Sequence, residues 1–144
     1  MRAPLLALCL AAPLTALAQS VPETPGRMEA AWRAAFDIQG DMLTPAQHVE
    51  LAALAWHIVA GDLCEDIAVD QEKFAAALGA MKHGDGDDTT EEERRFFRDF
   101  VLINLGVAVG IMLAEHADDV PATCEEAHET MKEEGAEHLF VASE

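Results

Sequence analysis

The cysteines are the residues whose chemistry is easiest to delimit. Three occur, Cys9, Cys64 and Cys124, and no two form the Cys-x-x-Cys spacing of redox catalysis. A zinc site would need more ligands at short spacing than the sequence offers. In an oxidising compartment the simplest outcome is one structural disulfide between Cys64 and Cys124, closing a loop of about sixty residues. The chain-entropy model assigns such a loop roughly 4 kcal/mol of stabilisation.

The histidines offer a second set of reactive groups, but their spacing is unfavourable for a metal site. Glu125 and His128 form Glu-x-x-His, one half of a di-iron signature, without the second half that such a site needs. His57 and Cys64 share one face of a predicted helix, yet a Cys-His nucleophile pair is disfavoured because Cys64 has a disulfide partner available. No two of the six stand three or four residues apart: His48, His57, His83, His116, His128 and His138.

The acidic loop Asp85-Gly86-Asp87-Asp88 invites a calcium interpretation. An EF-hand loop beginning at Asp85 would need glycine at its sixth position and glutamate at its twelfth, where the chain has Thr90 and Phe96. A solvated surface loop is therefore favoured, and low-affinity divalent-metal binding is the alternative. Phosphate-loop, dinucleotide, haem and hydrolase motifs are absent from the sequence. We predict no catalytic residue, no metal ligand and no cofactor.

Asn104 is the one polar residue inside the longest apolar run of the mature chain, Phe100 to Ala114. A buried asparagine must find hydrogen-bond partners, so Asn104 is predicted to be a satisfied core amide or the wall of a small polar cavity. Gly106 and Gly110, four residues apart in the same run, permit close approach of another backbone. We expect a neighbouring helix of the same chain to use them, and a dimer seam is the alternative.

The N-terminus has the order of a secretory signal peptide. Arg2 is followed by an apolar run from Leu5 to Leu17 and by a small-x-small cleavage site, so cleavage is expected after Ala18. The run of about thirteen residues is shorter than the roughly 20 that cross a bilayer, which disfavours a retained anchor. Residues 1–18 are therefore predicted to be removed, residues 19–26 to form a flexible leader, and the protein to be secreted, in the periplasm.

The charge balance limits the class of partner. The chain has 27 acidic and nine basic residues, a formal net charge of −18. Nucleic acids and anionic membrane surfaces are disfavoured because binding them requires clustered lysine and arginine. A protein partner is expected, and the sequence does not specify the oligomeric state.

Local start and stop signals predict an all-α single-domain bundle of about five helices over residues 27–137, followed by a loose tail at residues 138–144. Gly40 is the stop signal of the first helix, and Thr90 with Glu93 forms a capping box for the longest one. The predicted helices run from Thr24-Pro25 to Gln39, from Thr44-Pro45 to Cys64, from Asp70 to Gly84, over about 91–116, and from Asp119-Val120 to Gly135.

The longest predicted helix, about 91–116, is apolar on every face from Phe100 to Ala114. Fifteen helical residues span about 22 Å, which is less than the roughly 30 Å of a hydrocarbon core. Asp99 and Glu115 also bound the run closely. We therefore predict no membrane span and expect this helix to be the central one of the bundle, covered by the four others.

One segment resembles a known family. Residues 64–78, CEDIAVDQEKFAAAL, are similar to the segment around the first cysteine of the small periplasmic acid-stress chaperones. Those proteins are all-helical, secreted and joined by one disulfide, so the resemblance implies the same for this chain. The leading functional prediction is a non-enzymatic protein-binding or accessory module. An acid-stress chaperone and a low-affinity divalent-metal-binding protein are the alternatives.

Overall fold

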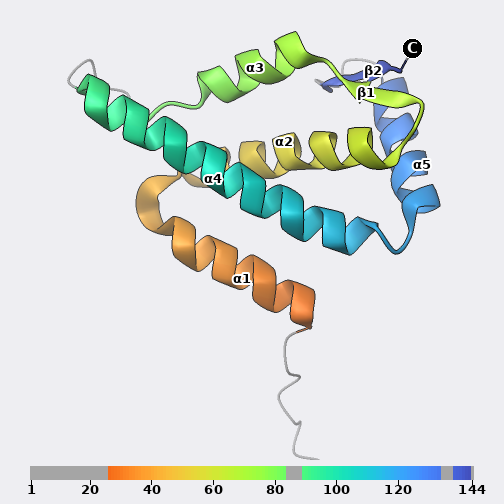
Figure 1. Cartoon of the computed structure of the whole chain (residues 1–144), viewed down its shortest axis with the longest axis horizontal. Helices are drawn as coiled ribbons and strands as arrows, with labels where there is room; N and C mark the ends of the chain where they lie inside the picture. The colour runs from red at the N-terminus through yellow and green to blue at the C-terminus, as the bar shows by residue number, and fades with distance from the viewer. Residues whose placement is uncertain (1–25, 84–88, 134–137, 144) are drawn as a thin grey trace, which may run out of the picture.

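The computed structural model describes residues 26–83, 89–133 and 138–143 and shows an all-α bundle with one small sheet. Figure 1 shows the long helix α4 crossing in front of α2, with α1 beside it. The predicted fold class is confirmed. The helices are α1 (Arg27–Gln39), α2 (Pro45–Leu63), α3 (Gln71–Ala80), α4 (Glu91–His116) and α5 (Val120–Lys132), a 3-10 turn covers Gly40–Met42, and the strands are β1 (Ile67–Val69) and β2 (Phe140–Ala142).

Side-chain caps set the start of four of the helices. Thr44 and Thr90 each form a full capping box, with Gln47 and Glu93 as the reciprocal partners. Asp70 accepts hydrogen bonds from the first turn of α3, and Asp119 accepts one from that of α5. These starts agree with the sequence prediction. Thr24 and Pro25, the expected start of the first helix, lie outside the described residues.

Helix ends agree less well with the sequence. Gly40 ends α1 with a φ of 52°, a left-handed conformation that glycine adopts without strain. Helix α3 ends at Ala80 rather than at Gly84, and α5 ends at Lys132 rather than at Gly135. The glycine stop signals thus placed these helix ends a few residues too late.

The core lies mainly between α2 and α4. Leu51, Leu54 and Ala55 of α2 pack against Phe97 and Val101 of α4. Helix α1 lies along the second half of α4, where Trp32 Nε1 donates a hydrogen bond of 3.3 Å to Glu115 Oε2. These contacts cover two sides of α4 and leave a third side open.

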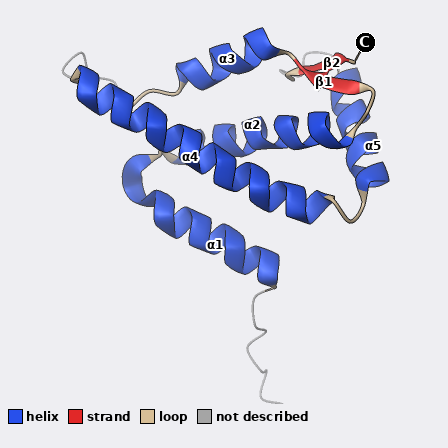
Figure 2. Cartoon of the chain, viewed as in Figure 1, coloured by secondary structure: helices blue, strands red, loops and turns tan. Residues whose placement is uncertain are grey.

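A second buried cluster surrounds the disulfide. It joins the end of α2 to α5 and to both strands, and its members are Ala60, Cys64, Ile67, Ala127 and Phe140. Figure 2 places the two red strands at the end of the bundle beside α5. The disulfide end therefore has its own small core, separate from that of α2 and α4.

The C-terminal residues correct the sequence prediction of a loose tail. Strand β2 pairs antiparallel with β1, with Ile67 opposite Ala142 and Val69 opposite Phe140. Phe140 is only 2% exposed. Burial of the Phe140 ring stabilises the ordered conformation of this segment. A three-residue strand is too short to be recognised from alternation of apolar and polar residues alone.

Helix α4 is not covered on every side, which corrects the prediction that four helices surround it. Its buried residues, Phe97, Val101, Asn104, Leu105 and Ala108, form one face. On the opposite side Phe96 is 62% exposed and Ile103 is 68% exposed. The partners α1 and α2 cover neighbouring sides, whereas α5 packs against α2 (Figure 1).

Among the described residues, α4 is also the one helix long and apolar enough to cross a membrane by length and composition, and 28% of its most apolar window is buried in the fold. The whole helix has 26 residues and spans about 39 Å, so length alone does not exclude a span. The absence of a membrane span therefore stays a prediction, based on the acidic residues at both ends.

Candidate functional site

Cys64 and Cys124 are joined by a disulfide, as the sequence predicted. Cys64 follows the last turn of α2 and Cys124 lies in the second turn of α5, with an S–S distance of 2.03 Å and a Cα–Cα distance of 5.6 Å. The geometry is that of an ordinary disulfide. Cys64 is therefore not available as a nucleophile for His57.

His57, in α2, makes the contacts of a buried core residue. Its side chain is buried, and its Nδ1 lies 2.7 Å from the carbonyl oxygen of Ala53. Its ring centroid lies 4.5 Å from that of Phe140. Nε2 is buried and has no hydrogen-bond partner within the described part of the chain. Burial lowers the pKa of His57 below its ordinary value, the hydrogen bond to Ala53 opposes that shift, and the nearby His138 adds to it.

The other histidines make separate local contacts. His128 Nε2 lies 3.1 Å from Asp66 Oδ2, which connects α5 to the turn before β1. His116 Nδ1 lies 3.2 Å from Thr123 Oγ1. Within the described residues, histidine, cysteine and acidic side chains do not gather in groups of three or more that could hold a metal ion. The loop Asp85–Asp88 lies outside those residues.

Asn104 is buried in the face of α4 that meets α2. Its Nδ2 donates a hydrogen bond of 2.8 Å to the carbonyl oxygen of Phe100, one turn earlier in the same helix. The residue is 2% exposed, and it does not line the groove described below. Its contact is that of a core amide that bonds to its own helix.

The sequence predicted that a neighbouring helix packs on Gly106 and Gly110 of α4, and this prediction is wrong. A Cβ atom at Gly106 or Gly110 would have no neighbouring atom within 4 Å, so no helix in the described part of the chain packs on either of them. The tight glycine is Gly61 of α2, where an added Cβ would lie 3.0 Å from Cγ2 of Val69. The spacing of the α4 glycines was visible in the sequence, but the side of the helix left uncovered was not.

The first candidate site is the uncovered side of α4, here called the α4 face. It combines bulky apolar residues with the two glycines, and its members are Phe96, Leu102, Ile103, Gly106, Val107 and Gly110. In Figure 1 no helix lies in front of α4. The exposed Asp99 lies on the same side of the helix, between Phe96 and Ile103. Exposed apolar residues gathered in this way on a folded domain mark an interaction surface.

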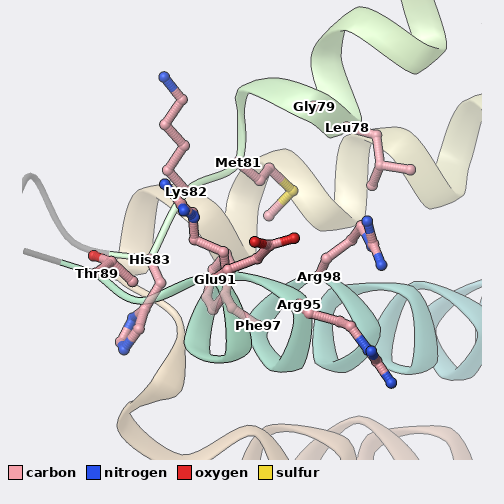
Figure 3. Close-up of a pocket in the computed structure, with 11 residues that line it drawn as sticks. Leu78, Gly79, Met81, Lys82, His83, Thr89, Glu91, Arg95, Phe97 and Arg98 are labelled. Carbon is pink, nitrogen blue, oxygen red and sulfur yellow. The ribbon is translucent and has the colours of Figure 1, made fainter. Parts of the chain in front are cut away.

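The second candidate site is a groove of about 730 Å³ between the end of α3 and the first half of α4, here called the basic groove. Its charged lining includes Lys82, Arg94, Arg95 and Arg98, with Glu91 as the acid, and its floor contains Met81 and Phe97. Figure 3 shows the carboxylate of Glu91 turned toward Met81, while Lys82 extends outward. Sequence reasoning missed this groove. The basic cluster at 94–98 was recognisable, but only the fold brings Lys82 beside it.

Comparison with known proteins adds no family to these observations. No protein-family model, no curated protein and no solved structure matches the chain.

Proposed function

We propose that the protein is a secreted, non-enzymatic binding module that docks a helix of a partner protein on the α4 face. One observation carries the proposal: bulky apolar side chains stay exposed along α4 although the rest of the domain has a packed core. Ile103 is 68% exposed and Phe96 is 62% exposed. Leaving such a stripe in water is unfavourable unless a partner covers it.

The expected occupant is an amphipathic helix with basic flanks. Gly106 and Gly110 carry no side chains, and an added Cβ would meet no atom of the described residues within 4 Å, so a partner backbone can approach α4 closely. A net charge of −18 favours positive residues around the apolar contact. Recognition of an apolar helix stripe by a helical surface is a common mode of protein binding.

The test is site-specific photocrosslinking in the full-length chain in its native host. A crosslinking residue replaces Ile103, and the matched control replaces Val49, an equally apolar residue of α2 that is 72% exposed. We expect a protein adduct from position 103 and none from position 49. The purified partner should then lose at least tenfold in affinity for Gly106→Leu, whose added side chain blocks close approach.

The same experiment distinguishes the other occupants. Adducts with only a second copy of this chain would assign the face to self-association, and adducts with lipid would assign it to a membrane. Equal adducts from both positions would indicate non-specific contact. Each of these results would overturn the proposal.

A second candidate, an acid-stress chaperone, is favoured by the buried His57. Protonating this ring places a charge against Phe140, which closes the small core at the disulfide end. Acid would thereby loosen β2 and expose apolar surface. The measurement is client aggregation with dye binding at about pH 3, and a protein that stays compact and inert there would exclude this role.

A further inference from the structure

The basic groove concentrates positive charge that the rest of the molecule lacks. The chain has nine basic residues against 27 acidic ones, and four of the nine line this one groove. Glu91 is the acidic residue of the lining, so the lining carries four cations and one carboxylate, besides His83. In so acidic a protein, this local reversal of sign makes the groove an attractive place for an anion.

These cations are not consumed by ion pairs on their own helix. Helical spacing would allow Glu91 to pair with Arg94 or Arg95. Across the described ranges, the ion pair that these cations form within 4.0 Å joins Arg98 Nε to Asp99 Oδ1 at 3.7 Å, between two exposed side chains. Such an exposed contact is weak. Arg94 and Arg98 stand four apart on one side of α4 and can both turn to an anion.

The floor of the groove is apolar and firmly built. Met81 and Phe97 are buried, and the ring of His83 stacks on Phe97 at a centroid distance of 5.2 Å. The segment after α3 is anchored to α2, because Gln47 Nε2 donates a hydrogen bond of 2.7 Å to the carbonyl oxygen of Lys82. Two separate elements therefore hold the cations and the apolar floor in one place.

We propose that the basic groove binds an amphiphilic organic anion, with its acidic group at Arg94 and Arg98 and its apolar body against Met81 and Phe97. The groove volume of about 730 Å³ falls in the range of small-molecule sites. Guanidinium groups suit carboxylate and phosphate equally, because both accept two parallel hydrogen bonds. This site is distinct from helix docking on the α4 face and stands without it.

The test is calorimetric titration of the folded full-length protein with decanoate, decyl phosphate, decanol and inorganic phosphate. Both amphiphilic anions should bind at least tenfold more tightly than the neutral alcohol and than free phosphate. Decanol matching decanoate would show that the apolar floor alone binds, and inorganic phosphate matching decyl phosphate would show an anion site without an apolar component. Either result, or the absence of any binding, overturns the proposal.

Substitutions in the groove test whether decanoate binds there. Arg94→Gln with Arg98→Gln should weaken decanoate at least tenfold, whereas the control pair Arg33→Gln with Lys132→Gln changes the net charge equally and should leave the affinity unchanged. Glu91→Gln removes the one lining carboxylate and should tighten binding several-fold. Equal losses from both pairs would indicate a general charge effect, and no loss from the groove pair would exclude the site. All the substituted side chains are exposed, so the fold should survive.

Discussion

The ring of His57 lies 4.5 Å from the ring of Phe140, and this contact joins the middle of α2 to the last strand of the chain. Phe140 has almost no exposed surface, and it also packs near Cys64 and Ala127. The ionisable ring of His57 therefore packs against Phe140, a buried residue of the small core at the disulfide end.

Stability should fall as the pH drops, because of His57. Its folded-state pKa lies below the unfolded value near 6.5, so the unfolded chain binds more protons in that interval. The contribution of neutral His57 is complete above about pH 6.5 and is lost as the pH falls through the folded pKa. Melting temperatures measured between pH 8 and pH 4 should show this loss.

His57→Leu should reduce that pH dependence, because leucine fills the space without a titrating group. Ile58→Leu, at the next position of α2, changes no titrating group; it is the control and should keep the slope of the parent. An unchanged slope in His57→Leu would place the acid sensitivity elsewhere.

Phe140→Ala should cost about 3–5 kcal/mol of unfolding free energy, as large-to-small substitutions of buried aromatic residues do. Val141→Ala, its neighbour in β2 and 39% exposed, should change stability by about 0.5 kcal/mol or less. Urea denaturation of both variants makes the comparison. If Phe140→Ala cost no more than its neighbour, β2 would not belong to the folded core.

Removing the disulfide should destabilise the protein by about 4 kcal/mol, since Cys64 and Cys124 are 60 residues apart and their bond restricts a long loop of the unfolded chain. Urea unfolding of Cys64→Ala with Cys124→Ala, compared with the oxidised parent, gives the value. Reducing the parent with a thiol should have the same effect. A free energy of unfolding that did not change would show that the loop is already restricted in the unfolded state.

Gly106→Ala and Gly110→Ala should each stabilise the fold by about 1 kcal/mol, because alanine is the better helix former and the new methyl group meets no atom within 4 Å. Gly61→Ala is the control, since its methyl group would lie 3.0 Å from Cγ2 of Val69. That variant should gain nothing. Thermal unfolding of the three variants decides the matter, and equal gains at all three positions would contradict the packing at Gly61.

Asn104→Leu should leave stability within about 1 kcal/mol of the parent. The amide bonds to the carbonyl of Phe100, one turn earlier in its own helix, which keeps a backbone partner in α4, so the substitution leaves no buried group unsatisfied. Chemical denaturation provides the measurement. A loss of about 3 kcal/mol or more would indicate that Asn104 supports a larger polar network.

The helix starts could be predicted because capping is local. Thr44, Asp70 and Thr90 each accept a hydrogen bond from a backbone N–H three residues later, so the sequence spacing alone predicts these caps. The disulfide was predictable for a different reason: only two cysteines, Cys64 and Cys124, follow the predicted signal peptide. Both inferences needed no knowledge of which elements touch.

Tertiary structure decided the features that depend on contacts between distant elements. The apolar run of α4 indicated burial, but which side stayed open depended on where α1 and α2 pack. Phe140 became part of a strand because β1, far away in sequence, pairs with it, with Val69 opposite Phe140. The basic groove likewise needed the fold to bring the segment with Lys82, after α3, beside Arg98 of α4. The composition determines the net charge and favours helices. The packing of the helices decides which charged and apolar side chains lie together on the surface.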